Sequence, residues 1–162
     1  MRRLVACFLL VIFGLGLWLL RPYLFLPAGT STISWWHADA FGQCSHEPSI
    51  GRANYWVPTA RQIADFEARM ASVMIEREKA GLEVPPPGQR FNGQFIGFTR
   101  KGVRCIYGNF FPSYLADEER WTSEWSPFGD PKCVADGGRY FWGIVYDPET
   151  NEVEQPIFNG VG

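Results

Sequence analysis

The residues best equipped for chemistry lie in one short stretch, from His37 to Glu47, which contains both histidines of the chain. Two imidazoles, a thiolate and a carboxylate are donor types that bind zinc, so His37, Asp39, Cys44 and His46 form a candidate metal site. Glu47 would then serve as a general base toward a metal-bound water. The spacing is neither the helical i, i+4 pair nor a zinc-knuckle pattern. The stretch therefore raises two catalytic alternatives, a metal-assisted hydrolase and a thiol of Cys44 activated by His46.

Aromatic residues are the second feature that indicates a site. The chain has 13 Phe, 7 Trp and 6 Tyr, and large aromatic side chains are enriched where proteins contact their partners. We therefore expect a flat surface that binds a protein, a peptide or a sugar ring. Alternatively, the rings cover an open sheet face, or lie at the membrane interface in the case of Trp35 and Trp36. The candidate binding residues are Trp35, Trp36, Trp56, Trp121, Trp125 and Trp142.

An apolar segment at the start of the chain predicts entry into a membrane. Residues 4–20 are seventeen consecutive uncharged positions that follow Arg2 and Arg3. As a helix they would measure roughly 26 Å, slightly less than the ~30 Å hydrocarbon core, and apolar residues after Arg21 would extend the span. We expect residues 1–28 to be an uncleaved anchor in the inner membrane, with the following domain exported to the periplasm. A signal peptide cleaved after Ala28 is the alternative, which would make the protein secreted or periplasmic.

The part of the chain after the leader is acidic. Without Arg2, Arg3 and Arg21, 12 basic residues stand against 17 acidic ones, a balance of −5. No run of Lys and Arg offsets this balance, which argues against a nucleic-acid partner. The remaining length, about 130 residues, suits one domain.

Three cysteines follow the leader: Cys44, Cys105 and Cys133. In an oxidising compartment, one pair and one leftover thiol are expected. We predict a disulfide between Cys105 and Cys133 because both residues fall in predicted strands of one sheet. If the chain is not exported, all three are expected to be ordinary buried thiols.

A single α+β domain over 58–162 is expected to position these residues, after an irregular, aromatic-rich lead-in over 29–57. The domain opens with a helix from about residue 60 to 80. Thr59 and Gln62 form a capping box at its start, and Gly81 closes it. Apolar residues at three- and four-residue spacing predict one side that faces the core: Ile63, Phe66, Met70, Val73 and Met74.

The period then shifts to two, which predicts strands. A hairpin turn at Lys101 and Gly102 separates strands over 95–100 and 103–111. A long loop over 112–131 precedes further strands at 132–135, 139–146 and 153–158, and Pro156 places the last one at an edge because it cannot donate a ladder hydrogen bond. We predict one long helix packed on a curled four- to five-stranded antiparallel sheet. This element order resembles cystatin-like folds, a resemblance of architecture that implies no activity.

The strand over 139–146 is expected to be covered on both faces. One face carries Tyr140, Trp142, Ile144 and Tyr146, and the other carries Phe141 and Val145. We expect one face to meet the helix. The other needs the lead-in, the long loop or a partner.

These features together favour an exported, membrane-tethered, non-catalytic binding module of the bacterial envelope type. Its partners would be the membrane, through the N-terminal helix, and a protein or glycan; no cofactor is expected. The alternative is a zinc hydrolase that uses His37, Asp39, Cys44 and His46. A purely structural envelope component is a third interpretation, and the sequence leaves the ligand open.

Overall fold

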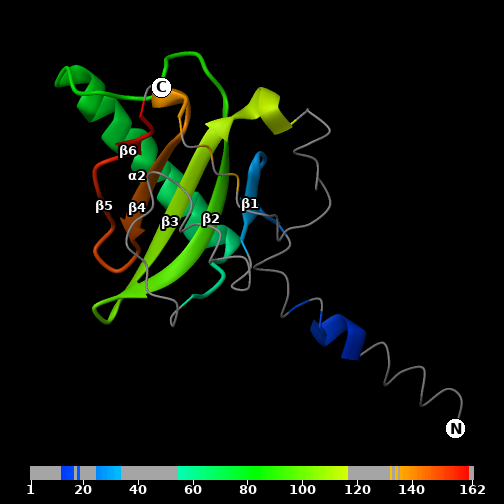
Figure 1. Cartoon of the computed structure of the whole chain (residues 1–162). Coiled ribbons are helices and arrows are strands. Elements are labelled where there is room, and N and C mark those ends of the chain that lie inside the picture. The colour runs from blue at the N-terminus through cyan, green and yellow to red at the C-terminus, as the bar shows by residue number, and fades with distance from the viewer. Residues whose placement is uncertain are drawn as a thin grey trace, which may run out of the picture.

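The protein folds as an α+β domain in which one long helix lies across one face of an open, mixed sheet (Figure 1). The computed structural model describes residues 12–16, 18, 25–33, 55–116, 132, 134 and 136–160. Over those residues the sheet order is β1-β2-β3-β4-β5, and β6 also pairs with β4. The elements are β1 (Thr30–Thr32), α2 (Ala60–Lys79), β2 (Phe91–Arg100), β3 (Val103–Pro112), the 3-10 turns η2 (Ser113–Ala116) and η3 (Gly138–Tyr140), β4 (Trp142–Asp147), β5 (Glu152–Val153) and β6 (Ile157–Phe158).

Helix α2 begins and ends where the sequence predicts. The side chain of Thr59 accepts a hydrogen bond from the backbone N–H of Gln62, and the Gln62 side chain accepts one from the backbone N–H of Thr59. This confirms the capping box, which satisfies two of the free donors at a helix start. After Ala80, Gly81 adopts a φ of 70°, a left-handed conformation that glycine adopts readily and that ends the helix.

The hairpin of β2 and β3 is the central pair of the sheet. The two strands pair in register over ten positions, from Phe91 with Pro112 to Arg100 with Val103. Lys101 and Gly102 connect them with φ values of 53° and 84°. Two consecutive positive φ values match the right-handed twist of the strands, so the predicted two-residue turn is confirmed.

Strand β1 makes the sheet mixed, and the prediction of a purely antiparallel sheet is wrong. Thr30, Ser31 and Thr32 pair in parallel with residues 93–95 of β2. Just beyond them, Trp56 forms an antiparallel bridge with Gly97 through two backbone hydrogen bonds of 2.8 and 2.9 Å. The lead-in therefore contributes to the sheet along the outer edge of β2. The sequence hides this strand because it is three polar residues long and its partner lies about 60 residues away.

The end of the chain confirms the predicted edge and corrects one boundary. Tyr140 belongs to η3 and is 45% exposed, so the predicted alternation holds only from Trp142 onward. β5 and β6 each pair with β4 through two residues, and the pairing register shifts by one residue between them. That shift is a bulge around Pro156, and within the described residues β6 pairs with no strand but β4. Lys132 and Val134, in the predicted strand 132–135, lie outside regular structure.

The predicted membrane segment falls largely outside the described residues. Residues 12–16 and 18 are helical. Among the residues that the structure covers, no helix combines the length and apolar character needed to cross a bilayer. Residues 1–28 therefore stay a prediction as an anchor or a signal peptide.

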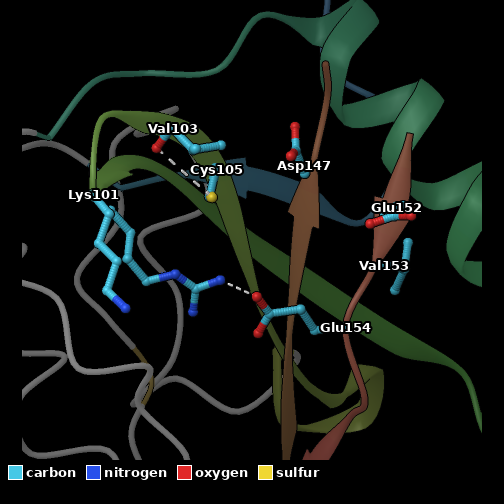
Figure 2. Close-up of a pocket in the computed structure, with 8 residues that line it drawn as sticks. Lys101, Val103, Cys105, Asp147, Glu152, Val153 and Glu154 are labelled. Carbon is cyan, nitrogen blue, oxygen red and sulfur yellow. Dashed lines mark hydrogen bonds and ion pairs between the residues drawn. The ribbon is translucent and has the colours of Figure 1, made fainter. Parts of the chain in front are cut away.

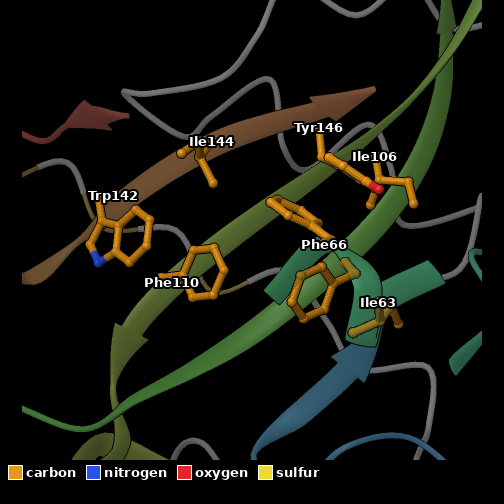
Figure 3. Close-up of a cluster of buried hydrophobic side chains, with 8 residues drawn as sticks. Ile63, Phe66, Ile106, Phe110, Trp142, Ile144 and Tyr146 are labelled. Atoms are coloured by element: carbon orange, nitrogen blue, oxygen red, sulfur yellow. The ribbon is translucent and has the colours of Figure 1, made fainter. Parts of the chain in front are cut away.

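Both faces of the sheet are buried, as predicted for the strand that became β4. The helix-covered face (Figure 3) joins two residues of α2 with alternate residues of β2, β3 and β4: Ile63, Phe66, Phe95, Ile106, Phe110, Trp142, Ile144 and Tyr146. The ring of Phe66 stacks on that of Tyr146 with centroids 5.1 Å apart and meets Phe95 edge to face at 5.5 Å. The opposite face holds a second cluster: Ile33, Ile96, Phe98, Cys105, Tyr107 and Val145.

Candidate functional site

Most residues of the two sites predicted from sequence lie outside the described part of the chain. This applies to the whole candidate metal set, His37, Asp39, Cys44 and His46, and to four of the six candidate binding tryptophans, Trp35, Trp36, Trp121 and Trp125. Both sites stay predictions at those positions. Within the described residues, no group of three or more His, Cys, Asp and Glu side chains is arranged to hold a metal ion.

The two described candidate tryptophans pack on the helix-covered face. Trp142 is 2% exposed and stacks on Phe110 with ring centroids 4.2 Å apart. Trp56 is half-buried over Gly97, with the guanidinium of Arg104 3.9 Å from its ring centroid. Its indole Nε1–H donates to the carbonyl of Phe98 at 3.3 Å. Both rings are therefore parts of the fold, and Trp142 offers almost no surface to a partner.

The predicted disulfide is wrong for Cys105, which is a free, buried thiol. Cys133 lies outside the described residues. A disulfide needs Cα atoms about 4.4–6.8 Å apart, and membership of one sheet does not by itself fix that distance.

The structure instead reveals a hollow of about 600 Å³ that is lined by charged side chains. It lies at the β2–β3 turn, against the ends of β4 and β5. Figure 2 shows Lys101 on one side, acidic side chains on the other, and the sulfur of Cys105 between them. We call it the charged hollow; its lining is Arg100, Lys101, Val103, Cys105, Asp147, Glu152, Val153 and Glu154.

An ion pair crosses the charged hollow. The guanidinium of Arg100 donates a hydrogen bond to Glu154, from β2 to the segment that follows β5. The bond raises the pKa of Arg100, so its positive charge persists at every physiological pH. The two side chains are 39% and 48% exposed, which limits their mutual stabilisation because water screens such pairs.

Asp147 is held by the turn that follows β4. Its carboxylate accepts hydrogen bonds from the backbone N–H groups of Glu149 at 2.8 Å and Thr150 at 3.3 Å. Desolvation raises the pKa of Asp147, but these bonds outweigh it and hold the pKa below its ordinary value. The carboxylate therefore stays negative at neutral pH.

The thiol of Cys105 lacks the properties of a nucleophile. Desolvation raises its pKa, an effect that the nearby charge of Arg100 only partly offsets. The thiolate is the reactive form of cysteine, so the side chain stays protonated and inert at neutral pH. Its one described hydrogen bond is a weak one to the carbonyl of Val103 at 3.9 Å.

Two charges of the charged hollow have no partner in the described part of the protein: the side chains of Lys101 and Glu152 make no hydrogen bond or ion pair there. This site cannot be predicted from the sequence, because its cations and its acids lie about 50 residues apart in the chain. The sequence predicts the turn at Lys101 and the turn before Glu152, but it does not show that the two turns lie side by side in the fold.

A second, more open hollow of about 510 Å³ lies between α2 and the turn after β4. The Nε–H of Arg69 donates to the carbonyl of Asn151 at 3.2 Å, and the hydroxyl of Tyr146 donates to the Asn151 side chain at 3.0 Å. These bonds tie the helix to the turn. The polar groups here already have partners, so we regard the charged hollow as the stronger candidate.

Comparisons with family models, with curated proteins and with solved structures found no match for this chain.

Proposed function

We propose that the protein is a non-catalytic binding module of the bacterial envelope, tethered to the inner membrane by its N-terminal helix. The observation that carries the binding role is the charged hollow, in which Lys101 and Glu152 retain charges that nothing in the described chain neutralises. Charged groups without internal partners at a concave surface are suited to contacts with another molecule. The ordered pairs around them, Arg100 with Glu154 and Asp147 with its turn, keep the walls in place.

The tether is supported by apolar side chains on the short N-terminal helix. Phe13, Leu15 and Trp18 are 66%, 55% and 67% exposed, and in Figure 1 this helix stands clear of the sheet. Large apolar side chains on an isolated helix are stabilised by transfer to lipid. The resemblance of the helix-then-hairpin order to cystatin-like folds adds nothing on activity, because one architecture hosts many functions.

A topology experiment on the full chain tests the tether. A reporter enzyme that is active only outside the cytosol, fused after residue 162, should be active, and the fusion should fractionate with the inner membrane. An inactive reporter on a stably expressed fusion would contradict export.

Photo-crosslinking in intact cells tests the binding role. A photoreactive residue in place of Val103, which lines the charged hollow and is 40% exposed, should yield a discrete crosslinked species, whereas one at Lys79, on exposed helix surface, should not. Absence of any adduct at position 103 would count against the module. Stoichiometric zinc that is lost on His37→Ala would instead support the hydrolase.

A further inference from the structure

The charged hollow has opposite signs on its two walls, and this arrangement points to the chemistry of its ligand. Lys101 stands on the wall formed by the β2–β3 turn, and Asp147 and Glu152 stand on the wall formed by β4 and β5 (Figure 2). Arg100 and Glu154 neutralise each other between the walls. The charges left over are one cation on the first wall and two carboxylates on the second.

We propose that the charged hollow binds a segment of a partner protein in which a basic residue lies close to an acidic one. The basic side chain lies against Glu152 and Asp147, and the acidic side chain lies against Lys101. This inference rests on the proposed binding function and names its ligand class. A ligand with charges of one sign only would meet a like charge on one wall, which is unfavourable.

The lining favours a peptide over a glycan or an apolar small molecule. Pockets for small organic ligands are lined mainly by apolar and aromatic side chains. Among its eight described lining residues the charged hollow has no aromatic ring, and its apolar members are Val103, Val153 and the thiol of Cys105. Sugar rings usually stack on aromatic faces, and the described lining residues offer none. Its volume of about 600 Å³ accommodates a few side chains.

Short capped peptides of equal length provide the direct test. The isotope-labelled full chain in detergent micelles is titrated with four peptides that carry one Lys and one Glu, two Lys, two Glu, or neither. The mixed peptide should bind roughly two- to fivefold more tightly than the other three, the effect of one exposed ion pair. It should shift the backbone amide signals of Lys101 and Glu152, and added salt should weaken it. Equal affinity for all four peptides would overturn the proposal.

A charge reversal within the turn sharpens this test. Lys101→Asp leaves an Asp-Gly turn, which suits the positive φ at this position, and makes both walls acidic. The preference should switch from the mixed peptide to the peptide with two Lys. Lys79→Glu, the same kind of change on an exposed part of α2, should leave the affinities for all four peptides unchanged. Glu152→Gln should reduce binding of the mixed peptide without any change in the β2–β3 turn. If Lys101→Asp leaves the preference unchanged, the proposal is wrong.

The proposed ligand class and the proposed binding function can be tested separately. A crosslinked envelope partner that persists in Lys101→Asp and Glu152→Gln would refute this ligand assignment and leave the binding module standing. Loss of that partner in both variants, with Lys79→Glu unaffected, would support both.

Discussion

The two faces of the sheet are buried to a similar degree but carry different types of side chain. The helix-covered face is made of aromatic and aliphatic side chains, with Phe66 in contact with both Phe95 and Tyr146. The opposite face places the amides of Gln94 and Asn109 among its apolar residues and ends in the charged hollow. The first face is therefore held together by contacts between apolar side chains and rings. The second combines apolar burial with hydrogen-bonded amides and, at one end, charged side chains.

Removal of a ring from the helix-covered face should have the largest effect. Phe66 is fully buried, so Phe66→Ala should lower the free energy of unfolding by about 3–5 kcal/mol through lost burial and the cavity left behind. Denaturant unfolding followed by near-ultraviolet circular dichroism measures it. Ser72→Ala, at an exposed position of the same helix, should change it by less than about 0.5 kcal/mol. Equal effects would contradict the assignment of the core.

The contact between Trp56 and Gly97 tests how closely the same face is packed. A Cβ atom added at Gly97 would overlap the indole ring of Trp56. We expect Gly97→Ala to cost about 1–3 kcal/mol of stability by displacing that ring. The cost should shrink in a Trp56→Ala background, which a double-mutant cycle measures. Additive effects would show that the two residues do not interact.

Loss of a buried hydrogen bond should destabilise the opposite face as well. The side-chain amide of Asn109 donates to the carbonyls of Lys132, at 2.8 Å, and Gln94, at 3.3 Å. Asn109→Ala should cost about 1–2 kcal/mol, because buried polar partners lose their bonds. Hydrogen exchange at the amide of Lys132, which donates to Gln94 at 2.7 Å, should accelerate. Unchanged exchange there would contradict this role.

The ion pair across the charged hollow should matter little for folding. Because Arg100 and Glu154 are 39% and 48% exposed, Arg100→Gln should cost less than about 1 kcal/mol, and less at high salt. Thermal unfolding at two salt concentrations measures this. A loss of stability above about 1 kcal/mol that does not depend on salt would mean that the ion pair stabilises the fold. The charged end of the opposite face would then differ less from the helix-covered face.

Asp147 should give the smallest effect, a dependence of stability on pH. Its pKa is lowered in the folded state, so its contribution is fully present above the unfolded-state value of about 3.9 and is lost as pH falls through the folded-state pKa. The stability difference between the protein and Asp147→Asn should therefore shrink below about pH 4. Denaturant unfolding across that range tests it, and a difference that grows on acidification would contradict the sign.

Local signals in the sequence predicted the elements that are held together locally. The capping box at Thr59 and Gln62 and the turn at Lys101 and Gly102 act within a few residues, so each was readable and each is confirmed. Features set by distant contacts were not readable. Strand β1 has no apolar alternation of its own and forms only because β2 offers a free edge.

The candidate site was the least predictable part for the same reason. In a sequence, reactive side chains stand out when they lie close together in the chain, as those from His37 to His46 do, or when they are large aromatic residues, as the tryptophans are. The charged hollow is built from ordinary Lys and Glu residues that only the sheet brings together. Cys105 shows the reverse error: a shared sheet suggested a disulfide, but sheet membership does not fix the distance between two side chains.

The parallel pairing of β1 has a consequence for the order of events during biosynthesis. Residues 30–32 leave the ribosome or the translocation channel well before residues 93–95, their partners in β2. Residues 30–32 therefore stay unpaired until about 60 further residues have emerged. Contacts between residues so far apart in the sequence slow folding. Thr30, Ser31 and Thr32 are polar, which lowers the tendency of this unpaired segment to aggregate with other nascent chains.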